Sequence, residues 1–343
     1  MHHLNNAMSS QTAESLPEKV RVSLGSAIVL GLLNGKLDAA PTTAYLMTFR
    51  EGKCTANCGF CPQARGSSSR ADMLSRISWP EFQTEHVLRK LREAVAAGTI
   101  GRVCIQALNY SDVFEHLCAL VRAICEESSV PVSVSCQPMT KENIRLLASA
   151  GAERIGIPLD AANEELFGKV KGRYAHGPYD WKSQLDLLGE AVEIFGRGRV
   201  STHFIANLGE TEEEMVRAIQ KCVGMGVLPA LFSFTPILGT ALEKRKQPSV
   251  ESYRRLQLAR RLILGGTTRF ENMRFDGKGR LADFGVDKQT LVKLVQTGEP
   301  FLTSGCPSCN RPYYNEKPSG PIYNYPRKPT EGELAEIESQ LRL

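Results

Sequence analysis

The sequence lacks any apolar stretch long enough to cross a membrane, which argues against a membrane-spanning protein. Residues 1–11 are polar, include two histidines and lack the apolar core of a secretory signal peptide. The net charge is only +5, and acidic and basic residues are interspersed, so no basic stripe suited to nucleic acid is present. The Lys-Arg-Lys run at residues 244–246 predicts a solvated loop, with a contact to an acidic protein substrate as the alternative. We therefore expect a cytoplasmic protein that binds neither membrane nor nucleic acid.

The chain also lacks the cysteine pattern of a small disulfide-stabilised domain, although it contains ten cysteines. Cys54, Cys58 and Cys61 fall within eight residues, and an odd group cannot pair internally. Several thiolates in one short loop suit zinc or an iron–sulfur cluster. This loop supplies three ligands rather than four, so a four-iron cluster bound here keeps one iron open to another ligand. The alternative is a zinc loop with a distant fourth ligand, although zinc loops more often use paired C-x2–4-C units.

Strand-like and helix-like segments alternate along the chain. Apolar runs typical of strands lie near residues 43–49, 101–106, 131–136, 153–158, 199–205, 229–235, 270–275 and 301–304. Helical patterns lie near residues 81–97, 111–127, 140–150, 161–170, 180–196, 211–225, 249–265 and 287–297, with starts marked by Ser78, Thr140 and Thr211. This alternation predicts an α/β fold, a closed (βα)8 barrel of the TIM type over residues 41–305. Barrel enzymes place their sites at the carboxyl ends of the strands, where the loop after the first strand would hold its cysteines.

Two extensions flank the predicted barrel. Residues 1–40 form an N-terminal extension, with disorder expected over residues 1–16 and one or two lead-in helices over residues 17–37. Residues 306–343 form an irregular C-terminal extension rich in Pro, Tyr and Asn. We expect this extension to drape over the barrel mouth and exclude water, with a loosely packed tail as the alternative.

Four further cysteines are candidate metal ligands. Cys104 and Cys136 lie on the second and third predicted strands, where the alternative is a small buried hydrophobic residue. Cys306-Pro-Ser-Cys309 is a two-cysteine clip that follows the last predicted strand and is expected at the top of the barrel. Its alternatives are a redox pair or half of a zinc knuckle. The remaining cysteines are predicted to be core residues: Cys118, Cys125 and Cys222.

The CxxxCxxC loop, Phe60 before its last cysteine and the apolar run at residues 44–49 resemble the radical S-adenosylmethionine (SAM) superfamily. The resemblance implies that Cys54, Cys58 and Cys61 hold a [4Fe-4S] cluster whose open iron binds SAM, with Phe60 beside the cofactor. Reductive cleavage of SAM in that superfamily yields a radical that removes hydrogen from unactivated carbon. The resemblance also implies a reductase, ferredoxin or flavodoxin as electron donor.

Residues 40–305 resemble biotin synthase and its relatives, in which an auxiliary cluster held by three cysteines and an arginine supplies sulfur. Cys104, Cys136 and Arg274 match three of those ligands, and Ser201 stands where the third cysteine is expected. The Cys306/Cys309 clip offers a replacement, so we hypothesise a second cluster bound by Cys104, Cys136, Cys306 and Cys309.

The same resemblance assigns SAM contacts to Asp160, Asn109 and Glu210, with a helix N-terminal charge as the alternative role of Glu210. Pro158 replaces an asparagine that the biotin synthases carry two residues before this aspartate, which argues against binding of the biotin precursor.

The tail pattern CPxCNRPYYNE resembles the biotin-synthase-related group found with two-component lipoyl synthases. This implies sulfur insertion into an octanoyl chain on a carrier domain, together with a second radical SAM protein. The alternatives are a biotin synthase with an atypical auxiliary cluster and a small-molecule substrate, a radical SAM mutase or carbon-skeleton enzyme, and a non-catalytic metal-binding scaffold.

Overall fold

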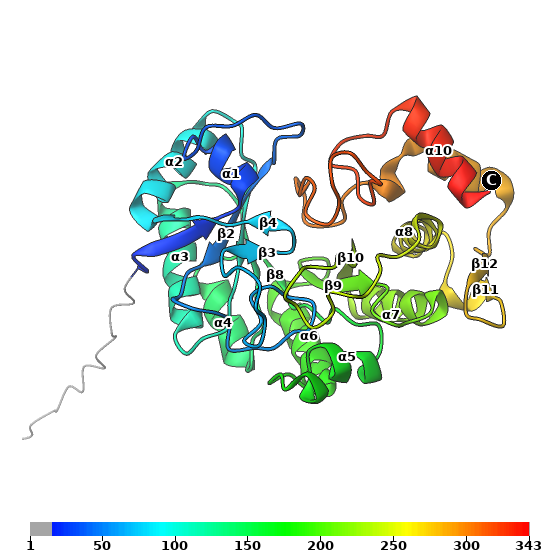
Figure 1. The fold of residues 1–343 in the computed structure, drawn as a ribbon, viewed down its shortest axis with the longest axis horizontal. Helices are drawn as coiled ribbons and strands as arrows, with labels where there is room; N and C mark the ends of the chain where they lie inside the picture. Colours follow the sequence, from blue (N-terminus) through cyan, green and yellow to red (C-terminus); the bar gives the residue numbers. More distant parts are fainter. Residues whose placement is uncertain (1–15, 343) are drawn as a thin grey trace, which may run out of the picture.

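The computed structural model describes residues 16–342, so all but the last residue of the stretch expected to be disordered, residues 1–16, lies outside the described part. A sheet forms the centre of the molecule (Figure 1), and its strand order is β10-β9-β8-β7-β6-β2-β1-β5. Its parallel strands are β2 (Thr43–Thr48), β6 (Arg102–Gln106), β7 (Val132–Ser135), β8 (Arg154–Gly156), β9 (Val200–Ala206) and β10 (Val227–Ser233). β1 (Lys19–Val22) pairs antiparallel with β2 and with β5 (Glu81–Gln83). The predicted α/β class with a mostly parallel sheet is therefore confirmed.

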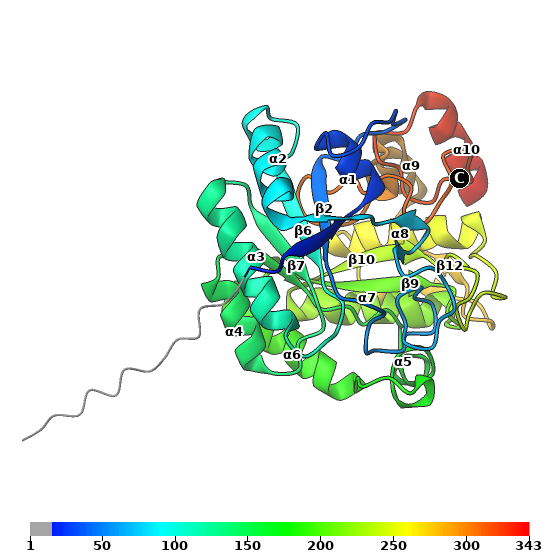
Figure 2. The ribbon, with the colours of Figure 1, turned by 60° about the vertical axis from the view of Figure 1, so that its left-hand side comes forward.

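Helices cover the outer face of this sheet (Figure 2). They are α2 (Thr84–Ala96), α3 (Val113–Glu127), α4 (Lys141–Ser149), α5 (Glu164–Val170), α6 (Trp181–Phe195), α7 (Glu212–Met225), α8 (Val250–Leu264) and α9 (Lys288–Thr297). Thr211 and Glu214 form the expected capping box of α7, and the Thr140 side chain caps α4. Ser78 does not begin a helix, because residues 77–83 contain the short strands β4 (Ile77–Ser78) and β5.

The expectation of eight parallel strands needs correction. In the described chain the parallel part ends at β10, and residues 274–275 form β11 (Arg274–Phe275), which pairs with β12 (Leu281–Asp283) in a separate ribbon. Residues 301–304 add no strand to the main sheet. Residues 17–37 supply β1 and one short helix, α1 (Leu24–Val29), rather than helices alone. The C-terminal extension ends in α10 (Glu331–Leu341), which the sequence pattern did not indicate.

The C-terminal segment lies along the open edge that six parallel strands leave. Ser304 Oγ exchanges hydrogen bonds with the backbone of Leu231 on β10, and the Ser308 carbonyl accepts from Thr43 Oγ1 at 2.9 Å. Further along, Thr235 Oγ1 donates to the Asn315 carbonyl at 2.7 Å, beyond the carboxyl end of β10. The segment therefore runs from the base of the barrel toward its mouth and bridges β10 and β2.

This course corrects the expected place of the cysteine clip. Ser308, inside the clip, bonds to Thr42 and Thr43, which stand at the amino-terminal end of β2. The clip therefore enters the barrel from its base and not from the top. The reason is that the chain reaches residue 306 from a short 3-10 turn (Glu299–Phe301) rather than from the carboxyl end of a strand.

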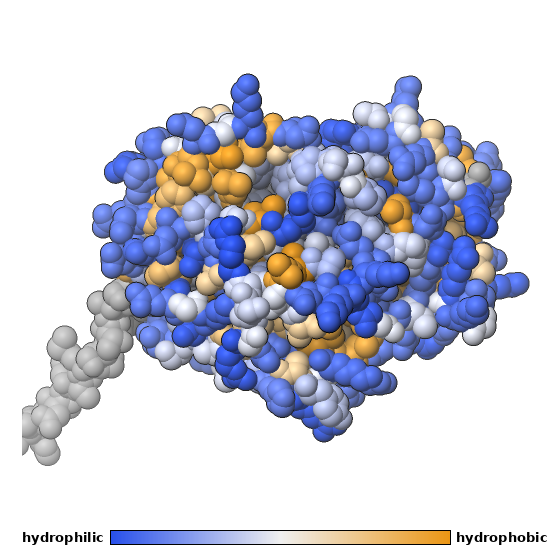
Figure 3. Space-filling model, viewed as in Figure 1, coloured by the Kyte–Doolittle hydropathy of each residue, from blue (hydrophilic) through white to orange (hydrophobic). Residues whose placement is uncertain are grey.

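Two apolar clusters fill the protein. The larger joins the helices to the outer face of the sheet, and the smaller lies inside the barrel around Tyr45, Met47, Trp79 and Leu108. No described helix has the length and apolar character to cross a membrane. The face in Figure 3 is largely hydrophilic with local apolar patches.

Phe301 anchors the C-terminal segment, and its ring is fully buried 5.4 Å from the Arg254 guanidinium. We expect Phe301→Ala to lower the free energy of unfolding by about 3–5 kcal/mol, because it leaves a cavity in the core. Chemical denaturation measures this loss. Leu238→Ala is the control, since Leu238 is 85% exposed and its removal should change stability by less than about 0.5 kcal/mol. Equal effects of the two variants would show that the segment is not packed as described.

Candidate active site

One cavity of about 280 Å³ opens inside the barrel and contains both cysteine groups in its walls. The CxxxCxxC loop lies at its mouth, and the Cys306/Cys309 clip lies toward its base. Most of the remaining wall is apolar or aromatic, contributed by Met47, Trp79, Phe232 and Phe234 among others. A chamber of this kind suits an apolar substrate, with polar groups at its two ends.

The loop of residues 54–61 follows β2 and carries three thiols that line the cavity. The backbone N–H of Asn109 donates to Cys54 Sγ at 3.1 Å, and the Gly59 N–H donates to the Val170 carbonyl at 2.7 Å. Burial raises the pKa of Cys58 to about 12 and raises that of Cys61 further. These thiols hold their protons at neutral pH unless a cation replaces them, as metal ligation does.

No three His, Cys, Asp or Glu side chains in residues 16–342 converge as ligands of a single metal ion would. The three loop thiols instead surround one end of a cavity, together with Phe60. Ligands of a multi-iron cluster stand farther apart than those of one ion. Three thiols, one accepting a backbone N–H, therefore form a donor set that fits an iron–sulfur cluster with an open iron.

Beside this loop, Asp160 forms a buried ion pair with Lys171. Lys171 is fully buried, and its Nζ donates to Asp160 Oδ2 and to the Pro158 carbonyl, each at 2.7 Å. The ammonium also faces the Tyr179 ring at 5.1 Å. Tyr179 OH accepts from Asn109 Nδ2 at 2.7 Å. Asp160 and Asn109, both expected near SAM, thus lie in the cavity wall beside the cysteine loop.

Glu210 does not join this group. Its carboxylate accepts the backbone N–H groups of Asn207, Leu208 and Gly209, and the residue is absent from the walls of the cavity. The carboxylate therefore stabilises the turn that precedes α7.

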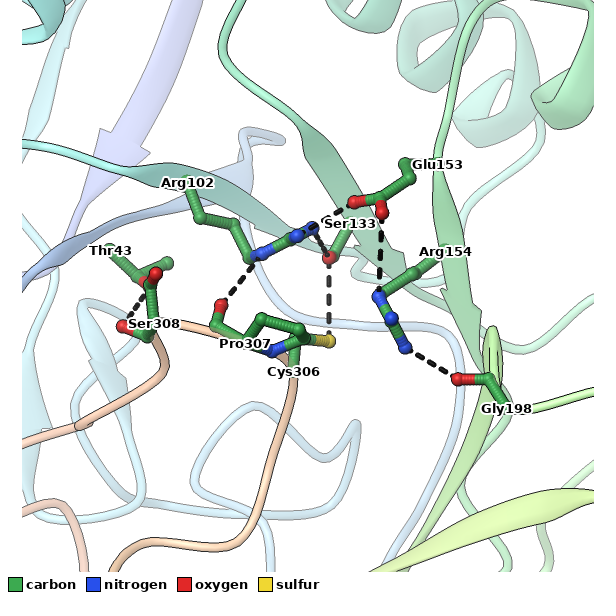
Figure 4. Close-up of polar contacts among 9 residues, drawn as sticks. All are labelled: Thr43, Arg102, Ser133, Glu153, Arg154, Gly198, Cys306, Pro307 and Ser308. Atoms are coloured by element: carbon green, nitrogen blue, oxygen red, sulfur yellow. Dashed lines mark hydrogen bonds and ion pairs between the residues drawn. The ribbon is translucent and has the colours of Figure 1, made fainter.

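A second group of thiols comprises Cys104, Cys306 and Cys309. Gln106 Nε2 donates to Cys104 Sγ at 3.1 Å, and Ser133 Oγ donates to Cys306 Sγ at 3.4 Å (Figure 4). The Tyr45 hydroxyl lies 3.3 Å from Cys309 Sγ. Burial raises the pKa of Cys104, and negative charge on Cys306 and Cys309 would raise it further because both are near. Three thiols in one wall, each with a polar hydrogen-bond partner, fit an auxiliary cluster.

The two other residues expected in this group differ in position. Cys136 follows β7 and is among the residues that line the cavity, and it also packs in the outer apolar core, where its electrostatic neighbour is Cys118 on α3. Its role as a cluster ligand therefore stays a prediction. Arg274 is exposed on β11, outside the main sheet, and does not line the cavity.

Arg311 takes the place that sequence reasoning gave to Arg274. Its guanidinium lies 3.8 Å from the centre of the Phe232 ring and favours the thiolate of Cys104. Its backbone N–H donates to the Tyr45 hydroxyl at 2.9 Å. The tail sequence that contains the clip, CNRPYYNE, already held this arginine, so its position two residues after Cys309 was the available signal.

His203 was also missed. It lies in the cavity wall on β9, and burial lowers its pKa to about 4, so its imidazole is neutral at physiological pH. Tyr45, Trp79 and Tyr314 form an aromatic wall nearby, with Tyr314 edge-on to Trp79 at 6.0 Å. Tyr45 lies in the apolar run before the cysteine loop and Tyr314 in the CPxCNRPYYNE pattern, whereas Trp79 had no sequence signal.

Comparison with known proteins agrees with this geometry. The sequence profile of the Radical SAM superfamily matches residues 52–222, which include the cysteine loop, Asp160 and Ser201. The chain belongs to the radical SAM superfamily. Membership implies a [4Fe-4S] cluster and SAM. The loop thiols are the residues that fit as ligands of the cluster.

Several biotin synthases are similar to this chain. That of Cutibacterium acnes is 29% identical over 209 residues, covering 58% of this chain and 53% of the relative. That of Synechocystis is 25% identical over 274 residues, covering 76% and 71%. The chain spans about half to two thirds of the length of most of these relatives. Their likeness places it in a biotin synthase-like group.

Solved structures support the fold. Methylornithine synthase has a TM-score of 0.50 and 13% identity, with 70% of this chain and 66% of that chain covered. The hydrogenase maturase of Carboxydothermus hydrogenoformans has a TM-score of 0.51 and 16% identity, with 71% and 55% covered. At these identities the likeness shows the barrel-type fold alone.

Tyr45 joins the clip to β2, so its hydroxyl is a site for a conservative test. We expect Tyr45→Phe to lower the free energy of unfolding by about 0.5–1.5 kcal/mol, because the partly buried Arg311 N–H loses its acceptor. Chemical denaturation measures the change. Tyr174→Phe is the matched control, since Tyr174 is 60% exposed. A Tyr45→Phe protein as stable as this control would contradict the bridge between clip and strand.

Proposed function

We propose that this radical SAM enzyme inserts sulfur at an unactivated C–H bond, as a component of a lipoyl synthase acting on a carrier-bound octanoyl chain. The observation that carries the proposal is the placement of two thiol groups at opposite ends of one apolar cavity. A carbon held between them would lie near both the group that activates it and the group that supplies sulfur. The bound cluster and SAM would supply the radical that removes the hydrogen atom.

The chain's own residues would bind and orient SAM and the substrate and shield them from water. Lys171 pairs with and positions the Asp160 carboxylate, which would accept a hydrogen bond from a polar group of SAM. The aromatic wall of Tyr45, Trp79 and Tyr314 would contact the alkyl chain and exclude water. Because His203 stays neutral, it adds no charge to the apolar middle of the chamber.

A protein-borne substrate is supported by the surface beside the mouth. Residues 237–246 pack on the cysteine loop through the Leu242 N–H, which donates to the Gly59 carbonyl at 3.0 Å. Leu238 is 85% exposed there, and Lys244 and Lys246 are exposed on the same segment. An acidic carrier domain would find both an apolar contact and positive charge at this rim.

The second candidate is a biotin synthase with an unusual auxiliary site, favoured by the similarity to biotin synthases. The two activities are separated by anaerobic reconstitution with iron, sulfide, SAM and reductant. Mass spectrometry then detects sulfur in an octanoylated carrier domain, supplied with a partner radical SAM protein, or in dethiobiotin. Sulfur in the carrier alone supports the proposal, and sulfur in dethiobiotin alone overturns it.

Substitution of the mouth cysteines should stop the first step. We expect Cys58→Ala to reduce 5′-deoxyadenosine formation to background, because a cluster ligand is lost. Chromatography of the reaction products measures this, with Cys125→Ala as control because Cys125 is exposed on α3 outside the cavity. Undiminished SAM cleavage by Cys58→Ala would remove the loop from the cofactor site.

Substitution in the clip should separate the two steps. We expect Cys306→Ala to retain 5′-deoxyadenosine formation, to lose the iron of one cluster and to transfer no sulfur, since the mouth thiols are intact. Iron and sulfide analysis with Mössbauer spectroscopy reports the cluster content, and Cys222→Ala is the comparison because Cys222 is buried on α7 and does not line the cavity. Full iron content and full sulfur transfer in Cys306→Ala would show that the clip is not part of the donor site.

A further inference from the structure

Each thiol of the Cys306/Cys309 clip contacts a hydroxyl group from a strand of the barrel. Ser133 Oγ on β7 lies 3.4 Å from Cys306 Sγ, and the Tyr45 hydroxyl on β2 lies 3.3 Å from Cys309 Sγ. Both hydroxyl-bearing residues are almost fully buried, and all four residues line the main cavity. The two contacts therefore belong to the packed wall of the barrel.

Arg102 fixes the direction of the Ser133 hydroxyl (Figure 4). Arg102 Nη1 donates to Ser133 Oγ at 2.9 Å, so this oxygen is an acceptor toward the arginine and keeps its own hydrogen for another partner. Among the described residues, Cys306 Sγ is the acceptor that receives this hydrogen. Arg102 is itself held by the Pro307 carbonyl, 2.9 Å from Nε, and by Glu153, 2.7 Å from Nη2. The arginine therefore orients the hydroxyl and fixes the clip backbone beside Cys306.

The Tyr45 hydroxyl is oriented in the same way. The backbone N–H of Arg311 donates to it at 2.9 Å, which leaves the hydroxyl hydrogen for Cys309 Sγ. A cysteine that binds iron has lost its proton, so its sulfur can only accept a hydrogen bond. With iron bound at the clip, the hydroxyl is therefore the donor in both pairs.

The thiols at the mouth have different partners. Cys54 Sγ accepts a backbone N–H, that of Asn109, and none of the described side chains donates a hydrogen bond to a mouth thiol. In the second group every sulfur has a side-chain partner, because Gln106 Nε2 donates to Cys104 Sγ at 3.1 Å. Hydrogen bonds to the sulfur ligands stabilise the more negative, reduced state of an iron–sulfur cluster and so raise its reduction potential.

We propose that Ser133 and Tyr45 are positioning residues of the second cluster, whose hydroxyl groups raise its reduction potential so that it accepts the electron left by sulfur transfer. The inference rests on the proposed function, because this electron arises only if the second cluster donates sulfur. A carbon radical brings one electron to a C–S bond that needs two. A sulfide of the cluster supplies the second, and the electron left unpaired on that sulfur reduces one iron(III) of the cluster to iron(II).

The test is a redox titration of the full-length protein after anaerobic reconstitution, followed by electron paramagnetic resonance. Addition of SAM changes the spectrum of the mouth cluster and so identifies it. We expect Ser133→Ala and Tyr45→Phe each to lower the equilibrium constant for one-electron reduction of the second cluster by about tenfold, which is about 59 mV, because one hydrogen bond to a charged group is lost. The potential of the mouth cluster should be unchanged, which also shows that each variant is folded.

Two controls separate a directed hydrogen bond from a general loss of polarity or packing. Ser135→Ala removes a hydroxyl from the same strand and cavity wall, where the described residues include no sulfur partner for it. Tyr253→Phe removes the hydroxyl of another buried tyrosine, which donates to the Leu231 carbonyl at 3.0 Å and does not line the cavity. Both should keep the wild-type potential of the second cluster. A shift in Ser135→Ala equal to that in Ser133→Ala would overturn the proposal.

The outcomes distinguish this inference from the function on which it rests. If the wild type assembles one cluster only, the proposed sulfur-donor function fails. If it assembles two clusters and neither Ser133→Ala nor Tyr45→Phe lowers the potential of the second, the inference is wrong and the function stands. Equal shifts of both clusters would also contradict the inference, since the two hydroxyls contact the clip sulfurs and not the mouth thiols.

Discussion

The insertion of the C-terminal segment between β10 and β2 is the contact on which the rest of the site depends. Six parallel strands do not close a barrel, and the exposed edge would open the cavity to water along its length. Side-chain hydrogen bonds from Ser304, Thr43 and Thr235 bridge this gap, and aromatic packing of Tyr314 on Trp79 seals its upper part. The same segment carries Cys306, Cys309 and Arg311, so closing the barrel and completing the second thiol group are one structural event.

Charge divides the chamber into two unlike ends. At the mouth, the Lys171–Asp160 pair is neutral overall and buried among aromatic rings, so it positions a polar group without adding a net charge. At the base, Glu153 lies 2.7 Å from Arg102 and 3.8 Å from Arg154. The middle is apolar, with a neutral His203. The chamber therefore has polar groups at its two ends and a mostly apolar wall between them.

Local sequence signals predicted the elements well because each was strong on its own. Six apolar runs became β2 and β6–β10, and capping at Thr140 and Thr211 placed the starts of α4 and α7. The cysteine loop followed from spacing alone. The wrong predictions concern which segments pair with one another, and the spacing of residues along the chain does not specify this. Residues 270–275 have strand-like composition, yet their partner is β12 rather than the sheet, which carries Arg274 to the surface.

Strand alternation explains why Cys104 and Cys136 are oriented differently, although the sequence places them on neighbouring strands. On β6, Arg102, Cys104 and Gln106 share the interior face, whereas on β7 that face belongs to Ser133 and Ser135. The two-residue alternation therefore orients Cys104 and Cys136 differently, although both are in the cavity lining. The Radical SAM profile ends at residue 222, so it includes Cys104 but not Cys306, Cys309 or Arg311. The other two thiols and the arginine come from a segment beyond the profile. Because this segment is not a strand, it can present Cys306, Cys309 and Arg311 on one side within six residues. In a strand, the two-residue alternation would place these side chains on opposite faces.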